Sequence, residues 1–191
     1  MKIAHLIAGA VLATSAFAAN AAELILFGEQ LSVVDRTHLV AAAKAAGGKL
    51  TQSTATSDVF NASRMGLLGA QTLEIVYLND HVVMAQYTLE KNSPTDERFR
   101  KMLVAKYGFP QTVDDAFRST APQKFDQEYV SDGKYRWKFG SSMELVFSKE
   151  FFGDRYLTYV NKPAQAQMQR LLDAADKKGA AQAAKAKSDV F

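Results

Sequence analysis

Apolar residues follow a helical spacing in two parts of the chain, residues 35–48 and 96–108. Each segment begins with acidic or hydroxyl side chains that can cap a helix, and each closes with a glycine, Gly47 or Gly108, suited to a helix end. The apolar stripe of the second segment consists of Phe99, Met102 and Leu103. We therefore expect two helices, each packing one face against a core.

Strand-like segments follow each of these helices. "TLEIVYL" (72–78) and "HVVMAQYTL" (81–89) flank an Asn-Asp pair, which is typical of a tight hairpin turn. After the second helix, "MELVFS" (143–148) and "RYLTYV" (155–160) flank a longer loop. The two sets of segments resemble each other at an offset of 70 residues, with the pairs Leu73/Met143, Glu74/Glu144, Ile75/Leu145, Val76/Val146 and Tyr77/Phe147.

This repetition predicts an α+β fold: a tandem repeat of helix plus antiparallel strands, with the helices on one face of the sheet or sheets, and a C-terminal helix. The strands form either one larger curved sheet or two adjacent ones. The place of "ELILF" (23–27), as a further strand or as a cover for a helix, stays open. The expected divisions are a signal peptide at 1–21, a first unit at 22–90, a second unit at 91–161, a C-terminal helix at 162–178 and a disordered tail at 179–191.

Cations and aromatics alternate in the segment "SDGKYRWKFGSSMELVFS", residues 131–148. Such alternation occurs on surfaces that stack on bases or sugar rings, and also in hairpins with one face in the core. A three-residue loop at 140–142 would set Phe139 opposite Met143, Trp137 opposite Leu145 and Tyr135 opposite Phe147. A two-residue loop would mismatch both faces, because strand side chains alternate with period two.

We therefore expect the aromatic residues of this hairpin to lie in the core and its cations to point outward. The cations form the candidate binding surface of the chain: Lys134, Arg136 and Lys138. The segment at 66–69 lies opposite 136–139 at the same offset and shows no such alternation.

The first residues have the features of an export signal. Lys2 precedes the apolar run "IAHLIAGAVLATSAFA", and small residues suit cleavage near Ala21/Ala22, with the end of "AFA" (16–18) as a second option. The alternative is a membrane anchor, but the run is short for a span of about 20 residues. The chain has no cysteine, so lipid attachment at a mature N-terminal Cys, disulfides and thiolate chemistry are excluded. We expect a periplasmic protein whose mature chain has no transmembrane segment.

This order of helix, glycine and strands, given twice after a signal, resembles small duplicated periplasmic α+β proteins, such as the β-lactamase-inhibitor-like and the outer-membrane-assembly lipoprotein (OmlA-like) folds. "LFG" (26–28), "KYGFP" (106–110) and the strands "YRW…MELVF…YLTYVN" are also similar to a group of uncharacterised exported proteobacterial proteins. The resemblance covers most of residues 24–165. It implies a fold with protein-binding members and transfers no functional residue, and the chain lacks the lipidated Cys of the lipoproteins.

The basic pI near 9.0 comes mainly from the end of the chain. Without Lys2 there are 22 basic and 20 acidic residues, and residues 162–191 hold six of the basic and three of the acidic ones. Residues 22–161 therefore carry 16 basic and 17 acidic residues. A nucleic-acid-binding protein concentrates positive charge on its folded surface, so we expect no nucleic-acid partner.

Residues with catalytic or metal-binding potential are few. His38 and His81 show no ligand spacing, so we expect surface histidines and no metal site. The loop at 140–142 lacks the second glycine of a nucleophile elbow, and "RMGLLGA" (64–70) lacks the Lys of a phosphate loop. The adjacent pair in "VDDAFR" (113–118) indicates a loop or a helix start.

These observations favour a protein without catalytic residues or cofactor. We expect a binding, inhibitor or accessory module for another envelope protein, which would grip its partner with a sheet face or with the loops between strands. The alternative is a binder of a small ligand or an envelope polymer, a glycan or a lipid, on which Trp137 and its aromatic neighbours would stack. A hydrolase with a dispersed site is the third and weakest hypothesis.

Overall fold

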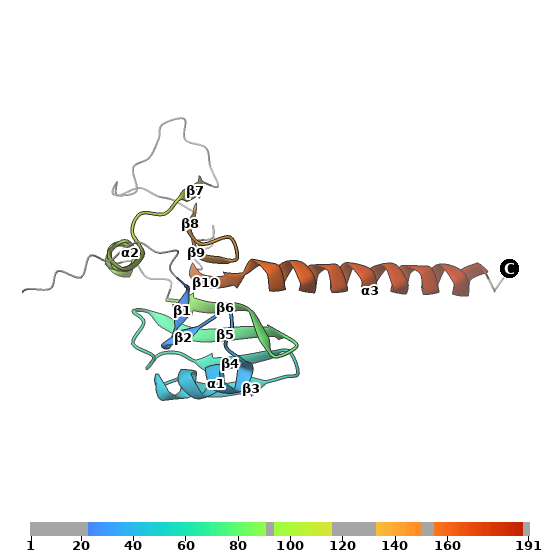
Figure 1. Cartoon of the computed structure of the whole chain (residues 1–191), viewed down its shortest axis with the longest axis horizontal. Helices are drawn as coiled ribbons and strands as arrows, with labels where there is room; N and C mark the ends of the chain where they lie inside the picture. Colours follow the sequence, from blue (N-terminus) through green and yellow to red (C-terminus); the bar gives the residue numbers. More distant parts are fainter. Residues whose placement is uncertain (1–22, 91–93, 116–132, 150–154, 189–191) are drawn as a thin grey trace, which may run out of the picture.

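The computed structural model describes residues 23–90, 94–115, 133–149 and 155–188 (Figure 1). The expected signal peptide and its cleavage site lie outside these residues. Eight of the described strands form one antiparallel sheet, in the order β3-β4-β5-β6-β10-β9-β8-β7. The strands of the first unit are β3 (Lys49–Ser53), β4 (Ser57–Asn61), β5 (Ala70–Leu78) and β6 (His81–Leu89). Those of the second unit are β7 (Thr112–Asp115), β8 (Gly133–Phe139), β9 (Met143–Lys149) and β10 (Arg155–Asn161).

The two units have the same order of elements, and they meet in the middle of this sheet. Each unit is a helix followed by four strands that pair in sequence order, and β6 pairs with β10 to join the units. The predicted α+β tandem repeat is therefore confirmed, and it forms one sheet, not two. A single buried cluster runs through both units, so residues 22–90 and 91–161 are halves of one core.

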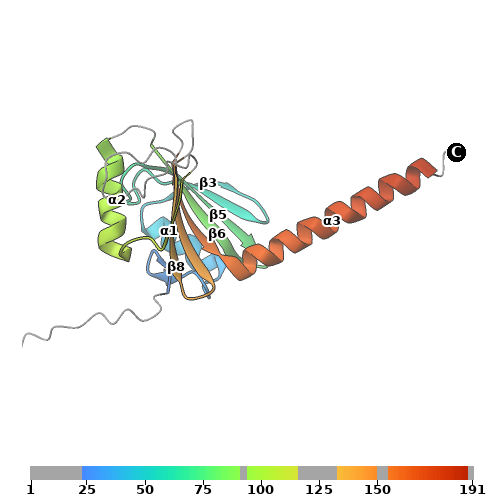
Figure 2. The same cartoon turned by 90° about the horizontal axis from the view of Figure 1, so that it is seen from above.

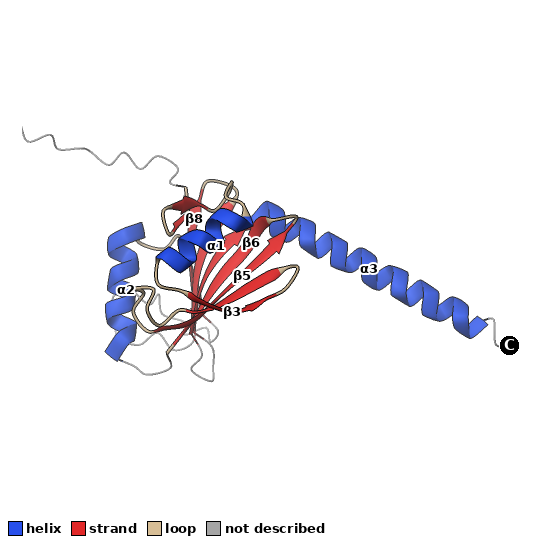
Figure 3. Ribbon diagram, turned by 90° about the horizontal axis from the view of Figure 1, so that it is seen from below, coloured by secondary structure: helices blue, strands red, loops and turns tan. Residues whose placement is uncertain are grey.

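Helices α1 (Arg36–Ala45) and α2 (Pro94–Tyr107) lie against the same face of the sheet (Figures 2 and 3). The Asp35 side chain caps α1 by accepting a hydrogen bond from the His38 amide at 2.9 Å. In α2 the predicted apolar stripe faces the core, with Phe99 and Leu103 buried and Met102 partly buried, and the centroid of the Phe99 ring lies 5.2 Å from that of Phe147 on β9. Gly47 and Gly108 follow the two helices with positive φ, as predicted.

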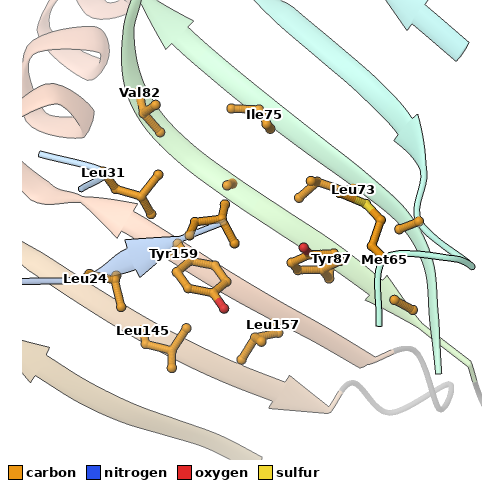
Figure 4. Close-up of a cluster of buried hydrophobic side chains, with 14 of the residues drawn as sticks. Leu24, Leu31, Met65, Leu73, Ile75, Val82, Tyr87, Leu145, Leu157 and Tyr159 are labelled. Carbon is orange, nitrogen blue, oxygen red and sulfur yellow. The ribbon is translucent and has the colours of Figure 1, made fainter. Parts of the chain in front are cut away.

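The segment at 23–27 neither joins the main sheet nor covers a helix from outside. It forms a separate hairpin of β1 (Ile25–Leu26) and β2 (Glu29–Gln30). The hairpin and its flanking residues bury three leucines in the shared core: Leu24, Leu26 and Leu31. Figure 4 shows Leu24 and Leu31 beside the central strands. The hairpin therefore acts as part of the layer that covers the sheet.

The hairpin of β8 and β9 has the register that the sequence predicted. A loop of three residues connects Phe139 to Met143, and Trp137 lies opposite Leu145. Tyr135 and Trp137 are buried, and Phe139 is half-buried against the core. The aromatic side of the segment therefore faces the helices.

The C-terminal helix α3 (Lys162–Ser188) is longer than predicted. Asn161 caps it, with its side chain accepting from the Ala164 amide at 3.3 Å. Residues 179–188, which the sequence predicted as part of a disordered tail, continue the helix in the structure. Alanine, lysine and glutamine all favour a helix, and no proline interrupts them. At 27 residues, α3 has a length of about 40 Å and projects away from the sheet (Figure 1).

One further element differs from its prediction. The pair Asp114-Asp115, expected in a loop or helix start, belongs to strand β7 at the edge of the sheet. Pairing with β8 places these residues, although acidic residues have a low propensity for strands.

Candidate binding face

The face of the sheet opposite α1 and α2 is the candidate functional surface, and we call it the open face. Along each strand, the side chains of the open face alternate with those of the core. Residues that pair across neighbouring strands therefore form a row on this face, which runs from one unit to the other. That row passes through Gln52, Val59, Glu74, Gln86, Thr158, Val146 and Arg136. Helix α3 contacts the sheet at one end, next to β6 and β10.

A shallow basin of about 420 Å³ lies on the open face of the second unit. Its lining comes from β6, β8, β9 and β10 and consists of Gln86, Lys134, Arg136, Val146, Ser148, Tyr156, Thr158 and Val160. Gln86 Nε2 donates to Thr158 Oγ1 at 3.0 Å, which joins the two units across the β6–β10 pairing. None of the eight lining residues is a histidine or a carboxylate.

The structure brings two of the three predicted cations together. Lys134 is exposed and Arg136 half-buried, and both line the basin. Lys138 is exposed on the same face near the hairpin loop and does not line the basin. The interpretation of these residues as an outward row is therefore confirmed, but only Lys134 and Arg136 share a concave surface.

The predicted hairpin register sets Glu144 opposite Lys138, and the structure confirms this pairing, but the sequence did not indicate the ion pairs that Glu144 forms. Glu144 on β9 is buried, and its oxygens lie 3.4 Å from Arg136 Nη1 and 3.6 Å from Lys162 Nζ. Glu144 was visible as a repeat of Glu74, but the sequence did not show that it would contact the first residue of α3. The contact links the basin to the start of the long helix.

Trp137 cannot stack on a ligand in this structure. Its side chain is 1% exposed on the opposite face of the sheet, and its Nε1 donates to the carbonyl oxygen of Gly108 at 2.8 Å. The version of the ligand-binding hypothesis that relied on this ring is therefore wrong. The physical reason is the period of two, which places Trp137 and Arg136 on opposite faces.

A second polar cluster, which the sequence did not indicate, fixes α1 to strands β3 and β4 of the first unit. Arg36 forms a two-pronged ion pair with Asp58, with distances of 2.9 Å from Nε and 2.8 Å from Nη2. Ser53 Oγ donates to the same carboxylate at 2.6 Å, and the guanidinium lies 4.9 Å from the centroid of the Tyr77 ring. Burial acts to raise the pKa of Asp58, but the hydrogen bonds from Arg36 and Ser53 and the charge of Arg36 outweigh it and lower the pKa.

The two histidines of the described chain are surface residues. His38 Nδ1 lies 2.7 Å from Asp35 Oδ2, and the hydrogen bond from the His38 amide contributes most to the lowered pKa of Asp35. His81 is exposed at the start of β6. Across the described ranges, no three His, Asp or Glu side chains gather in an arrangement that could hold a metal ion.

Comparison of the chain with protein-family models, curated proteins and solved structures finds no match. The class of protein therefore rests on the fold and the site: an α+β protein with one twisted antiparallel sheet and an open polar face. Helices in the described ranges, α3 included, lack the combination of length and hydropathy needed to cross a bilayer.

Proposed function

We propose that this chain is an exported, periplasmic, non-catalytic binding module that holds an acidic segment of another envelope protein on its open face. The basin supports this proposal, because Lys134 and Arg136 lie there among hydroxyl and amide groups. Two cations and several hydrogen-bond donors favour a partner rich in carboxylates. We infer the periplasmic location from the signal-like sequence of residues 1–21.

The shape and chemistry of the basin support a protein partner over a small molecule. Small-molecule sites are enclosed and mostly apolar, whereas this basin is shallow and polar on a broad sheet face. The rims of protein interfaces are polar, and complementary charge there raises association rates and specificity. The lining itself supplies no histidine or carboxylate as a general base, which supports a binding role over a catalytic one.

The proposal is tested by charge changes in the basin. The variant Lys134→Glu with Arg136→Gln removes the positive charge and avoids a new carboxylate next to Glu144. A control matched in charge changes two exposed cations of the first unit outside the basin, Lys44→Glu with Lys49→Gln. Wild type and control are expected to capture the same periplasmic protein, with affinity that falls as salt rises, because both charges are screened.

Capture of that partner at undiminished affinity by the basin variant would overturn the proposal. So would a partner whose binding is insensitive to salt. Circular dichroism of each variant confirms that the fold is intact before its binding is compared.

A further inference from the structure

The helix-covered side of the sheet contains a second hollow, which we call the inner cavity. It has a volume of about 260 Å³ and lies between α2, the β1–β2 hairpin and the central strands β6 and β10. Its walls are mainly apolar and include Leu26, Met65, Leu67, Met102, Leu103 and Leu157. The cavity therefore lies where the two units meet, on the opposite face from the basin.

Three tyrosines from three elements line this apolar space: Tyr87, Tyr107 and Tyr159. The rings of Tyr87 and Tyr159 meet edge to face, with centroids 6.4 Å apart (Figure 4). The hydroxyl of Tyr107 is buried and lies near that of Tyr159, but it forms no hydrogen bond of good geometry with any group in the described part of the chain. Burial first, and then the neighbouring Tyr107, raises the pKa of Tyr159, so the Tyr159 phenol stays protonated.

An unpaired buried hydroxyl is costly to a protein, so its presence needs an explanation. A ligand atom that accepts its proton supplies one. The cavity also has a cation at its edge, because Lys106 lines it and places its Nζ 5.0 Å from the centroid of the Tyr107 ring. A hydroxyl donor and an ammonium group beside apolar walls favour a ligand with an anionic head and an apolar body.

The β1–β2 turn adds an independent observation. Phe27 and Gly28 connect the strands with φ of 56° and 87°, the signs of a type I′ turn. Asn or Asp normally precedes Gly in this turn, and positive φ is unfavourable for a side chain as large as phenylalanine. Phe27 lines the cavity and packs on the core, so the strained position is occupied by the ring that covers the cavity.

We propose that the inner cavity binds a small apolar carboxylate, such as a medium-chain fatty acid. The Tyr107 hydroxyl donates to the carboxylate, Lys106 balances its charge, and the leucine and methionine walls enclose the chain. The volume exceeds the ~150 Å³ of an apolar cavity that takes benzene, and lies below the ~300 Å³ where pockets for larger ligands begin. A medium-length acyl chain or a single substituted ring matches this size.

Trp137 provides the readout, because its indole donates to the carbonyl of Gly108, the residue after Tyr107. Octanoate is the probe, and octanol is its uncharged counterpart. Octanoate is expected to change the Trp137 emission in a saturable way with one site per chain. Isothermal calorimetry gives the same stoichiometry.

Two variants separate the roles of the polar groups. Tyr107→Phe removes only the hydroxyl and is expected to weaken octanoate binding about tenfold, the effect of one hydrogen bond to a charged group. Lys106→Gln is expected to weaken octanoate binding and to leave octanol binding unchanged. Lys44→Gln, an exposed lysine on α1, is the matched control and keeps wild-type affinity.

Unsaturable binding of octanoate, no binding in the millimolar range, or equal affinity in the wild type and in both variants would overturn the assignment. The basin variant Lys134→Glu with Arg136→Gln is expected to bind octanoate normally. Failure of the inner cavity is therefore distinguishable from failure of the open face.

Discussion

Trp137 shows how one buried residue connects the strands of the second unit to the helix that covers them. It lies opposite Leu145 in the hairpin, and its indole hydrogen bond fixes the end of α2 at Gly108. The residue therefore contributes apolar burial and a specific link between strand and helix. Its neighbours Arg136 and Lys138 point the other way, so substitutions at adjacent positions have opposite consequences.

Replacement of Trp137 by alanine is expected to lower the free energy of unfolding by about 3–5 kcal/mol, as for other buried large aromatics. Lys138→Ala, at an exposed position next to it, is expected to change it by less than about 0.5 kcal/mol. Urea denaturation followed by circular dichroism measures both. Equal stability of the Trp137→Ala variant and the wild type would contradict the core position of the ring.

Asp58 predicts a dependence of stability on acid. Its pKa is lowered in the folded state, so the stabilisation is complete above the unfolded value of about 3.9 and is lost as the pH falls through the folded pKa. Asp58→Asn is expected to cost about 3 kcal/mol near neutral pH, because it leaves the Arg36 charge without its partner. Below pH 4 the two proteins are expected to converge in stability. Urea unfolding from pH 7 to pH 2.5 tests this, and parallel curves for both proteins would contradict it.

The secondary-structure elements show what the sequence pattern can and cannot indicate. Strong periodicity predicted α1, α2, the β5–β6 hairpin and the register of β8 with β9, because each buries one continuous apolar face. Strand β7 and the polar edge strand β3 lack such a face, so their positions follow from pairing with neighbours. The offset of 70 also fails before β9, because 62–69 is a long connection whereas β8 and β9 are three residues apart.

The topological counterpart of β8 is therefore β4, not residues 66–69. β4 carries Ser57 and Val59 on the open face, so the cation row still belongs to the second unit alone. Half of the candidate site was predictable on this basis: the side of the sheet and its cations. Gln86, Tyr156 and Thr158 were not, because they reach the basin only through the pairing of β6 with β10.

The part of helix α3 that projects from the sheet is expected to contribute little to the stability of the fold. The side chains of residues 169–180 are exposed, with Leu171 and Leu172 at 54% and 53%. Removal of residues 177–191 is therefore expected to leave the midpoint of thermal unfolding unchanged and to reduce only the helical circular dichroism signal. A large fall in the midpoint would show that this part of α3 packs on the fold. A truncation that also removes Lys162 is a different change, because Glu144 then loses its ion pair with Lys162.

At the scale of the described molecule, the two units share one buried core, so we expect them to unfold cooperatively. The β6–β10 pairing and the shared buried cluster join the units, so neither half is expected to unfold alone. Native-state hydrogen exchange is expected to give the same global free energy for core amides of β5 and β9. A lower value for one of the two strands, with its own denaturant dependence, would indicate separate domains.

We proposed that the open face of the sheet binds another envelope protein. Site-specific photo-crosslinking in living cells tests it most directly, with the reactive group placed at Tyr156 in the basin or at Val33, which is 67% exposed beside the β1–β2 hairpin. We expect one discrete adduct from position 156 and no such adduct from position 33. The adduct from position 156 is expected to disappear when Lys134→Glu and Arg136→Gln are added. Adducts from position 33 alone, or an adduct from position 156 that persists without the basin charges, would contradict it.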